Sequence, residues 1–142
     1  MKKFIVLTTA FFVVAFTSTA QCDKTIRWTS SKSQFLDTVG NVLNEHDESV
    51  QVTTTQKRIL IIRHADEEQT LEGEITDYAC KWNDNQNGKT TFKSLLVDNK
   101  ENKTRHATII IEAVNGVTTI LLRAEEEETI IKLNIDSFEE VK

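Results

Sequence analysis

The sequence predicts an all-β domain, an antiparallel meander of about eight or nine strands that forms a small barrel or a two-layer sandwich. Three observations lead to this prediction. Short runs rich in β-branched residues recur along the chain. The polar turns between them are too short for the crossover that parallel neighbours require. The sequence has no proline and no low-complexity segment, which indicates one domain without a linker.

The predicted strands follow one another with only short gaps. They cover residues 25–29, 50–52, 58–63, 69–75, 78–82, 90–97, 107–114, 117–123 and 129–135. The clearest turn is Asn115-Gly116, because this pair between two β-branched runs readily adopts the positive φ angles of a type I′ hairpin. Asn87-Gly88 and residues 99–102 are predicted as further turns.

Three apolar runs depart from the strict alternation of a half-buried strand. They are residues 59–62, 109–111 and 120–122. A continuous apolar run is typical of a strand that is covered on both faces. We therefore expect the outward side chains of these strands to be partly buried.

Residues 33–44 fit two local structures. Phe35, Val39 and Val42 have the spacing of one face of a short helix. A glycine inside this pattern weakens a helix by about 1 kcal/mol, and residues 38–41 also fit a hairpin turn. Extended structure is the favoured interpretation, and a short helix is the alternative.

The N-terminal residues have the pattern of an export signal. Two lysines precede a 13-residue apolar run, and Ser18 and Ala20 occupy the −3 and −1 positions of a cleavage site. The run is shorter than the roughly 20 apolar residues that span a bilayer, and no second one follows. We therefore expect residues 1–20 to be a signal peptide and residues 21–142 a single β-rich domain. This domain would be periplasmic or extracellular and not an integral membrane protein.

The acidic balance of the chain limits its partners. Loss of Lys2 and Lys3 with the signal peptide would leave 15 basic and 22 acidic residues, a net charge of −7. Nucleic acid and anionic lipid both need a basic surface, so neither is an expected partner. The acidic run at residues 125–128 fits a solvated loop, although a role in attracting a basic partner stays open.

The two cysteines, Cys22 and Cys80, both follow the predicted cleavage site. An even pair in an exported protein predicts a disulfide, whereas a lipid-modified Cys22 and two free thiols are the alternatives. Tyr78, Cys80 and Trp82 share one face of a predicted strand by the period of two. We expect these side chains and Trp28 to pack in the core around the bridge.

An apolar run that ends in Arg63-His64-Ala65 resembles the signature of the histidine phosphatase (phosphoglycerate-mutase-like) family. The resemblance implies that His64 is a phosphate-accepting nucleophile and that Arg63 binds the phosphate. It also requires a second histidine, for which His106 is the only downstream candidate. That family has an α/β fold, whereas this chain is predicted to be all-β. A strand end exposed to solvent is the favoured interpretation, and we expect no enzymatic activity.

Metal and cofactor sites are not predicted. Residues 83–88 resemble a calcium loop, with side-chain oxygens at alternate positions and a glycine at the sixth. Position twelve, where such a loop needs an acid, is Ser94, so a polar hairpin turn is the favoured interpretation. His46, His64 and His106 lack the spacing of metal ligands.

These observations predict an exported, non-catalytic binding or interaction module. The partner would be a small apolar ligand inside a lipocalin-like barrel or a protein on the surface. The first predicts an interior too large for its own side chains to fill. The second predicts a packed interior and an exposed apolar or acidic patch. An acidic inhibitor of a cationic secreted enzyme, similar to the lysozyme inhibitors of cell envelopes, is the alternative.

Overall fold

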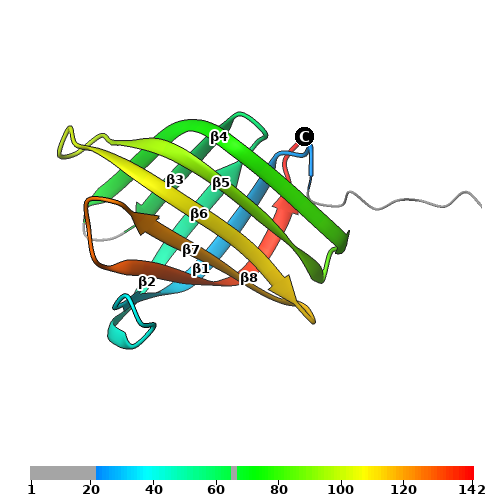
Figure 1. The fold of residues 1–142 in the computed structure, drawn as a ribbon, viewed down its shortest axis with the longest axis horizontal. Helices are drawn as coiled ribbons and strands as arrows, with labels where there is room; N and C mark the ends of the chain where they lie inside the picture. The colour runs from blue at the N-terminus through cyan, green and yellow to red at the C-terminus, as the bar shows by residue number, and fades with distance from the viewer. Residues whose placement is uncertain (1–21, 65–66) are drawn as a thin grey trace, which may run out of the picture.

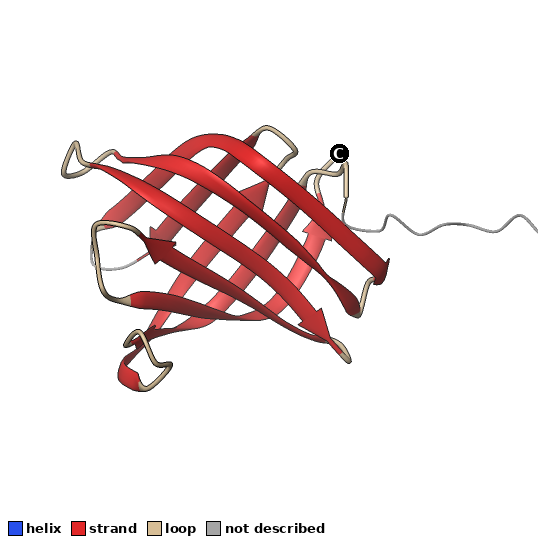
Figure 2. Ribbon diagram, in the orientation of Figure 1, coloured by secondary structure: helices blue, strands red, loops and turns tan. Residues whose placement is uncertain are grey.

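The computed structural model describes residues 22–64 and 67–142. Within these residues the chain forms eight strands and no helix (Figure 1, Figure 2). The predicted signal peptide, residues 1–20, lies outside the described residues. The strands are β1 Ile26–Leu36, β2 Val42–Thr54, β3 Arg58–His64, β4 Glu68–Asp84, β5 Asn87–Asp98, β6 Thr104–Val114, β7 Val117–Ala124 and β8 Ile130–Glu140.

The sheet closes on itself. Each strand pairs antiparallel with its sequence neighbour, and β8 pairs antiparallel with β1. In this last pairing Ile26 lies opposite Glu140 and Leu36 lies opposite Ile130. Short turns explain the topology, since they place each strand beside the one that precedes it. The predicted all-β antiparallel barrel is confirmed, and the sandwich alternative is wrong.

Alternate side chains along the strands fill the barrel. In β6, for example, Ala107, Ile109 and Ile111 are buried, whereas Thr108 and Ile110 between them are only partly buried. The same alternation in the other strands builds one apolar core. Its buried members are Ile26, Trp28, Val50, Val52, Ile59, Ile61, Trp82, Phe92, Leu96, Ala107, Ile109, Ile111, Ala113, Ile120 and Leu133.

The three continuous apolar runs lie in β3, β6 and β7. Their outward side chains include Leu60, Ile110 and Leu121, and all three are partly buried, as expected. Ile110 and Leu121 lie directly opposite each other in the β6–β7 pairing. The outer surface of the barrel therefore carries an apolar pair on β6 and β7.

Residues 33–44 are extended, and the short-helix alternative is wrong. β1 continues to Leu36, a turn covers residues 37–41, and β2 begins at Val42. Gly40 has a φ of +92°, a conformation that glycine adopts without steric cost. Pairing of β1 with strands on both sides outweighs the helical spacing of its apolar side chains.

β4 is one bent strand where the sequence predicted two. Its pairing with β5 shifts register between Thr76 and Ala79, and Asp77 has a φ of +52°. Such a bulge inserts an extra residue and bends the strand. Because of it, Ile75 and Tyr78 both pack against the core although they are three residues apart. The number of strands is therefore eight.

Two hairpin turns compare differently with their predictions. Asn115 and Gly116 have φ angles of 51° and 83°, as a type I′ turn requires, so this prediction is confirmed. The β4–β5 turn falls on residues 85–86, and its prediction at Asn87-Gly88 is wrong by two residues. Gly88 lies opposite Trp82, and an added Cβ would approach the indole ring to 2.3 Å. This glycine is needed for packing beneath the ring and not for the turn.

The end of the barrel at which β1 begins is closed by aromatic rings and by the bridge. Trp28 and Trp82 stack with their ring centroids 6.2 Å apart, and Phe138 lies 5.2 Å from Trp28. Cys22 and Cys80 form a disulfide, which confirms the predicted bridge. Because both thiols are in this bridge, the two alternatives, a lipid-modified Cys22 and two free thiols, are wrong. We call this the tryptophan end.

The opposite end carries the turns at residues 37–41, 99–103 and 125–129, and we call it the hairpin end. The chain returns to the tryptophan end, where the Val141 N–H donates to the Thr25 carbonyl oxygen at 2.8 Å. The first and last described residues therefore both lie away from the hairpin end (Figure 1).

Candidate functional site

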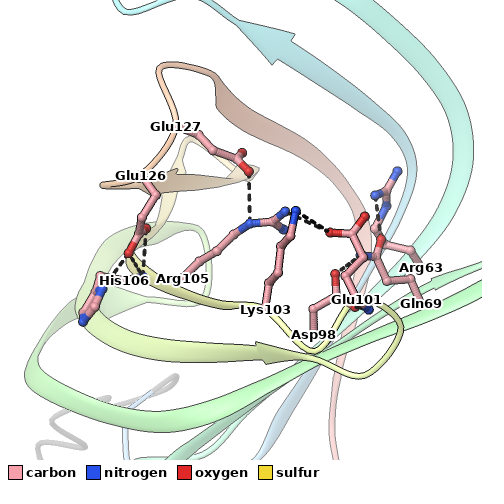
Figure 3. Close-up of polar contacts among 9 residues, drawn as sticks. All are labelled: Arg63, Gln69, Asp98, Glu101, Lys103, Arg105, His106, Glu126 and Glu127. Carbon is pink, nitrogen blue, oxygen red and sulfur yellow. Dashed lines mark hydrogen bonds and ion pairs between the residues drawn. The ribbon is translucent and has the colours of Figure 1, made fainter.

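A series of polar side chains crosses the hairpin end inside the barrel, from β1 to β5. Ser33 Oγ donates to Glu48 Oε1 at 2.8 Å, and Arg63 Nη2 donates to both oxygens of Glu48 at 3.0 and 3.1 Å. Arg63 Nη1 donates to Gln69 Oε1 at 2.9 Å, and Gln69 Nε2 donates to Asp98 Oδ2 at 2.5 Å. Five neighbouring strands thus each contribute one residue to what we call the polar relay. Figure 3 shows its part from Arg63 to Asp98.

The two carboxylates of the polar relay are buried but favour the ionised form. The Glu48 side chain is 9% exposed, and Asp98 is 0% exposed. Burial raises the pKa of both groups. For Glu48 the hydrogen bonds from its two relay partners and the charge of Arg63 outweigh burial, and its pKa falls below the ordinary value. For Asp98 the Lys100 N–H and the Gln69 side chain have the same effect on the pKa.

These lowered pKa values predict acid sensitivity. A carboxyl whose pKa is lower in the folded state stabilises the fold above its unfolded pKa and loses this contribution as the pH falls through the folded pKa. We expect the free energy of unfolding to decrease from pH 6 to pH 3, measured by urea titration. E48Q should show a shallower decrease than the wild type. E74Q, at an exposed position outside the polar relay, should keep the wild-type slope, and equal slopes in all three proteins would contradict the prediction.

Beneath the polar relay lies a cavity of about 60 Å³. Glu48, Arg63, Gln69 and Arg105 cap it, and its walls are mostly apolar: Phe35, Val50, Ile61, Leu71, Leu122, Ile131 and Leu133. Pockets for drug-sized ligands measure about 300–1,000 Å³. This cavity has the volume of one or two water molecules, so the side chains fill the interior almost completely.

Arg63 and His64, which the phosphatase resemblance would place around one phosphate, face opposite sides of β3. Consecutive strand residues alternate in direction. Arg63 points into the barrel and belongs to the polar relay, whereas His64 is exposed and lies 3.6 Å from Glu68. His106 contacts Glu126 at 2.6 Å. The structure does not assemble these three side chains into a single phosphate site.

The described residues contain no group of three or more His, Cys, Asp or Glu side chains placed to hold a metal ion. His46 packs edge-on against Phe35 with centroids 5.1 Å apart. In the segment that resembles a calcium loop, Asp84 Oδ1 accepts a hydrogen bond from the Gln86 N–H at 2.7 Å. Its side chain therefore organises the β4–β5 turn, as the hairpin interpretation expects.

One carboxylate fixes the β1–β2 turn at the hairpin end. Asp37 Oδ1 accepts hydrogen bonds from the N–H groups of Val39 and Asn41 at 3.0 and 2.8 Å, and Oδ2 accepts one from the Asn41 side chain at 3.0 Å. Two backbone hydrogen bonds, one from Gly40 to Asp37 and one from Asp37 to Asn41, close the same loop. The hydrogen bond from the Asn41 N–H is the main cause of the lowered pKa of Asp37.

This turn and the first two residues of β2 expose three large apolar side chains to solvent. Val39, Val42 and Leu43 are 81%, 54% and 58% exposed. We call residues 37–43 the hairpin tip, which projects from the body of the barrel in cyan in Figure 1. Because Asp37 already orders the turn, a partner that packs on these side chains would lose little conformational entropy in fixing them.

The loop between β7 and β8 is attached to the start of β6. Arg105 Nε donates to Glu127 Oε1 at 3.0 Å, and the His106 N–H donates to both carboxylate oxygens of Glu126 at 3.0 and 3.1 Å. The His106 ring also contacts Glu126, which raises the pKa of the imidazole. Figure 3 shows these contacts. We call residues 125–128 the acidic loop, and β6 holds it beside the barrel.

No family model, curated protein or solved structure matches the chain. The described part of the chain also lacks any helix long and apolar enough to cross a membrane.

Sequence analysis identified Arg63 for a different role and missed Glu48, Gln69 and Asp98. The alternation of inward and outward side chains along a strand is a sequence signal that could have identified these three residues. Each of the three lies two residues beyond an inward apolar side chain of its own strand, namely Val50, Leu71 and Leu96. A polar residue that continues an inward row of apolar side chains is a candidate for such a relay.

Proposed function

We propose that the protein is an exported, non-catalytic module that binds another protein through the hairpin tip. The observation that supports this proposal most directly is the exposure of Val39 on a turn that Asp37 fixes, with Val42 and Leu43 exposed at the adjoining start of β2. Apolar side chains gathered on a projecting, ordered turn are typical of interaction sites. The N-terminal export pattern and the disulfide support a location in an oxidising compartment.

The filled interior favours a protein partner over a small apolar ligand. A cavity of about 60 Å³ is far below the volume of pockets that enclose such ligands. Its cap includes the ion pair between Arg63 and Glu48, and opening the cap would separate these two side chains. Binding of a protein on the surface requires neither a larger cavity nor the separation of this ion pair.

Photo-crosslinking from the hairpin tip tests the proposal. The full chain would carry a diazirine amino acid in place of Val39, and irradiation would be done in the cells that produce it. We expect one defined protein adduct from position 39. Position 117 at the tryptophan end is the matched control, because Val117 is also exposed in a hairpin. D37A, which releases the turn but keeps its apolar side chains, should lower the yield several-fold.

Two kinds of result would contradict the proposal. Equal adducts from positions 39 and 117, or no adduct from position 39, would refute recognition through the hairpin tip. A yield that D37A does not change would contradict the role given to the ordered turn.

The acidic loop supports a second candidate function, inhibition of a cationic secreted enzyme. Residues 125–128 are consecutive glutamates at the hairpin end of the barrel, beside the hairpin tip. Lysozyme is a suitable probe because it is cationic, and its hydrolysis of cell walls is easily followed. Inhibition that weakens as salt rises from 0.05 to about 0.5 M would support this function, because salt screens exposed charges. Undiminished lysozyme activity at low salt would exclude this enzyme as the target.

A further inference from the structure

Two adjoining hollows lie on the outer surface of β6, β7 and β8. One has a volume of about 220 Å³ and extends from the acidic loop to Thr38 of the hairpin tip. The other, of about 180 Å³, lies over the apolar pair Ile110 and Leu121. Thr108, Arg123 and Ile130 line both hollows, which makes them one continuous groove. We call it the outer groove.

The floor of the outer groove faces outward and is apolar at Ile110, Leu121 and Ile130, with Thr108 and Arg123 beside them. Ile110 lies opposite Leu121, and Arg123 lies opposite both Thr108 and Ile130 in the strand pairings. Ile130 is 7% exposed, and Ile110 and Leu121 are partly buried. An apolar side chain of a partner placed here would remove further apolar surface from water.

The rim of the outer groove is acidic at the loop, where Glu125, Glu127 and Glu128 line the same hollow as Arg123. A second cation, Lys132, lies opposite Leu121 in the β7–β8 pairing. Glu127 is already paired with Arg105. Neither Glu125 nor Glu128 makes an ion pair within residues 22–64 and 67–142. Among the described residues, these two carboxylates therefore lie beside the apolar part of the floor without an ion pair of their own.

We propose that the outer groove binds a short extended segment of a cationic protein, in which basic and apolar side chains alternate. The inference rests on the proposed function and names the chemistry of the partner. An apolar side chain of the segment packs on Ile110 and Leu121. A lysine or arginine beside it reaches Glu125 or Glu128. The neighbouring hairpin tip contacts the same partner through Val39.

NMR titration of the ¹⁵N-labelled exported protein tests this inference. The probe is a capped five-residue peptide that alternates lysine and valine. We expect it to shift the amide signals of Thr108, Ile110, Leu121, Arg123 and Ile130. Binding should weaken as salt rises, and E125Q/E128Q should raise the dissociation constant about fivefold, as the loss of two exposed ion pairs would.

The controls separate charge from shape. E74Q/E140Q removes the same charge from exposed positions outside the outer groove and should leave the dissociation constant unchanged. Peptides with glutamine or glutamate in place of lysine should bind more weakly or not at all. Equal effects of the two double variants, or equal binding of the glutamine peptide, would overturn the cationic partner. Shifts of the same signals on dilution without peptide would assign the groove to a second copy of this chain and would also overturn it.

This experiment distinguishes the inference from the proposed function. Adducts from position 39 without any peptide effect in the outer groove would leave the protein-binding function in place and refute the groove. Peptide-induced shifts in the outer groove without any adduct from position 39 would refute recognition through the hairpin tip and leave the groove in place.

Discussion

Replacing Cys22 and Cys80 by serine is expected to lower the free energy of unfolding by about 4 kcal/mol. The bridge joins residues 58 positions apart, and the loop-closure entropy of the unfolded chain gives about this value for such a loop. A domain of this size has a total stability of about 5–15 kcal/mol. The expected loss is therefore a large share of the total free energy of unfolding. Urea unfolding followed by the fluorescence of Trp28 and Trp82 measures it directly.

Chemical reduction of the wild type provides the control for this prediction. The reduced protein and C22S/C80S should unfold at the same urea concentration if the covalent link is the cause. A loss below about 1 kcal/mol in both would contradict the argument. It would mean that packing of Cys22 against the core holds the segment before β1 without the bridge.

R63M is expected to destabilise the fold by about 2–3 kcal/mol. The substitution keeps an apolar stem but leaves Glu48 buried without its cation. Removing one partner of a fully buried pair costs about 3–5 kcal/mol, and the Arg63 side chain is 30% exposed, which lowers the expected cost. Gln69 would lose a donor at the same time. Urea titration at pH 7 provides the measurement.

A second variant distinguishes an unpaired charge from lost packing. In R63M/E48L no charge is left without a partner, so we expect this protein to be more stable than R63M alone. R58M is the matched control on the same strand. Its guanidinium lies 3.8 Å from Glu72, both side chains are more than half exposed, and its loss should cost less than about 0.5 kcal/mol. If R63M and R58M proved equally stable, the polar relay would have no structural role.

Most of the barrel could be predicted from the sequence because its information is local. Alternation in 107–113 defines an inward face, and Asn115-Gly116 fixes the next hairpin without any distant contact. Gly88 is an exception, because its role could not be predicted from the residues next to it in the sequence. Its use beneath the Trp82 ring depends on a cross-strand pair, so a turn signal at that glycine was misleading.

The candidate site could not be predicted to the same extent, because it depends on register between strands. Glu48, Arg63 and Gln69 meet only because β2, β3 and β4 pair with particular offsets. The acidic loop was visible as a run of charge. Its attachment through Arg105 and His106, and the apolar floor beside it, required the barrel to be closed.

Closure of the sheet also restricts how any partner can be recognised. Every strand of the barrel has a hydrogen-bonded neighbour on both sides over part of its length, so no strand is an edge strand throughout. Only overhanging ends, such as residues 76–84 of β4 and 137–140 of β8, are paired on one side. A peptide therefore has no full-length edge to pair with, and the usual backbone-directed route of recognition by β-domains is confined to those ends. Specificity then resides mainly in side chains and turns. Substitution of those side chains one at a time should therefore map the complete binding surface.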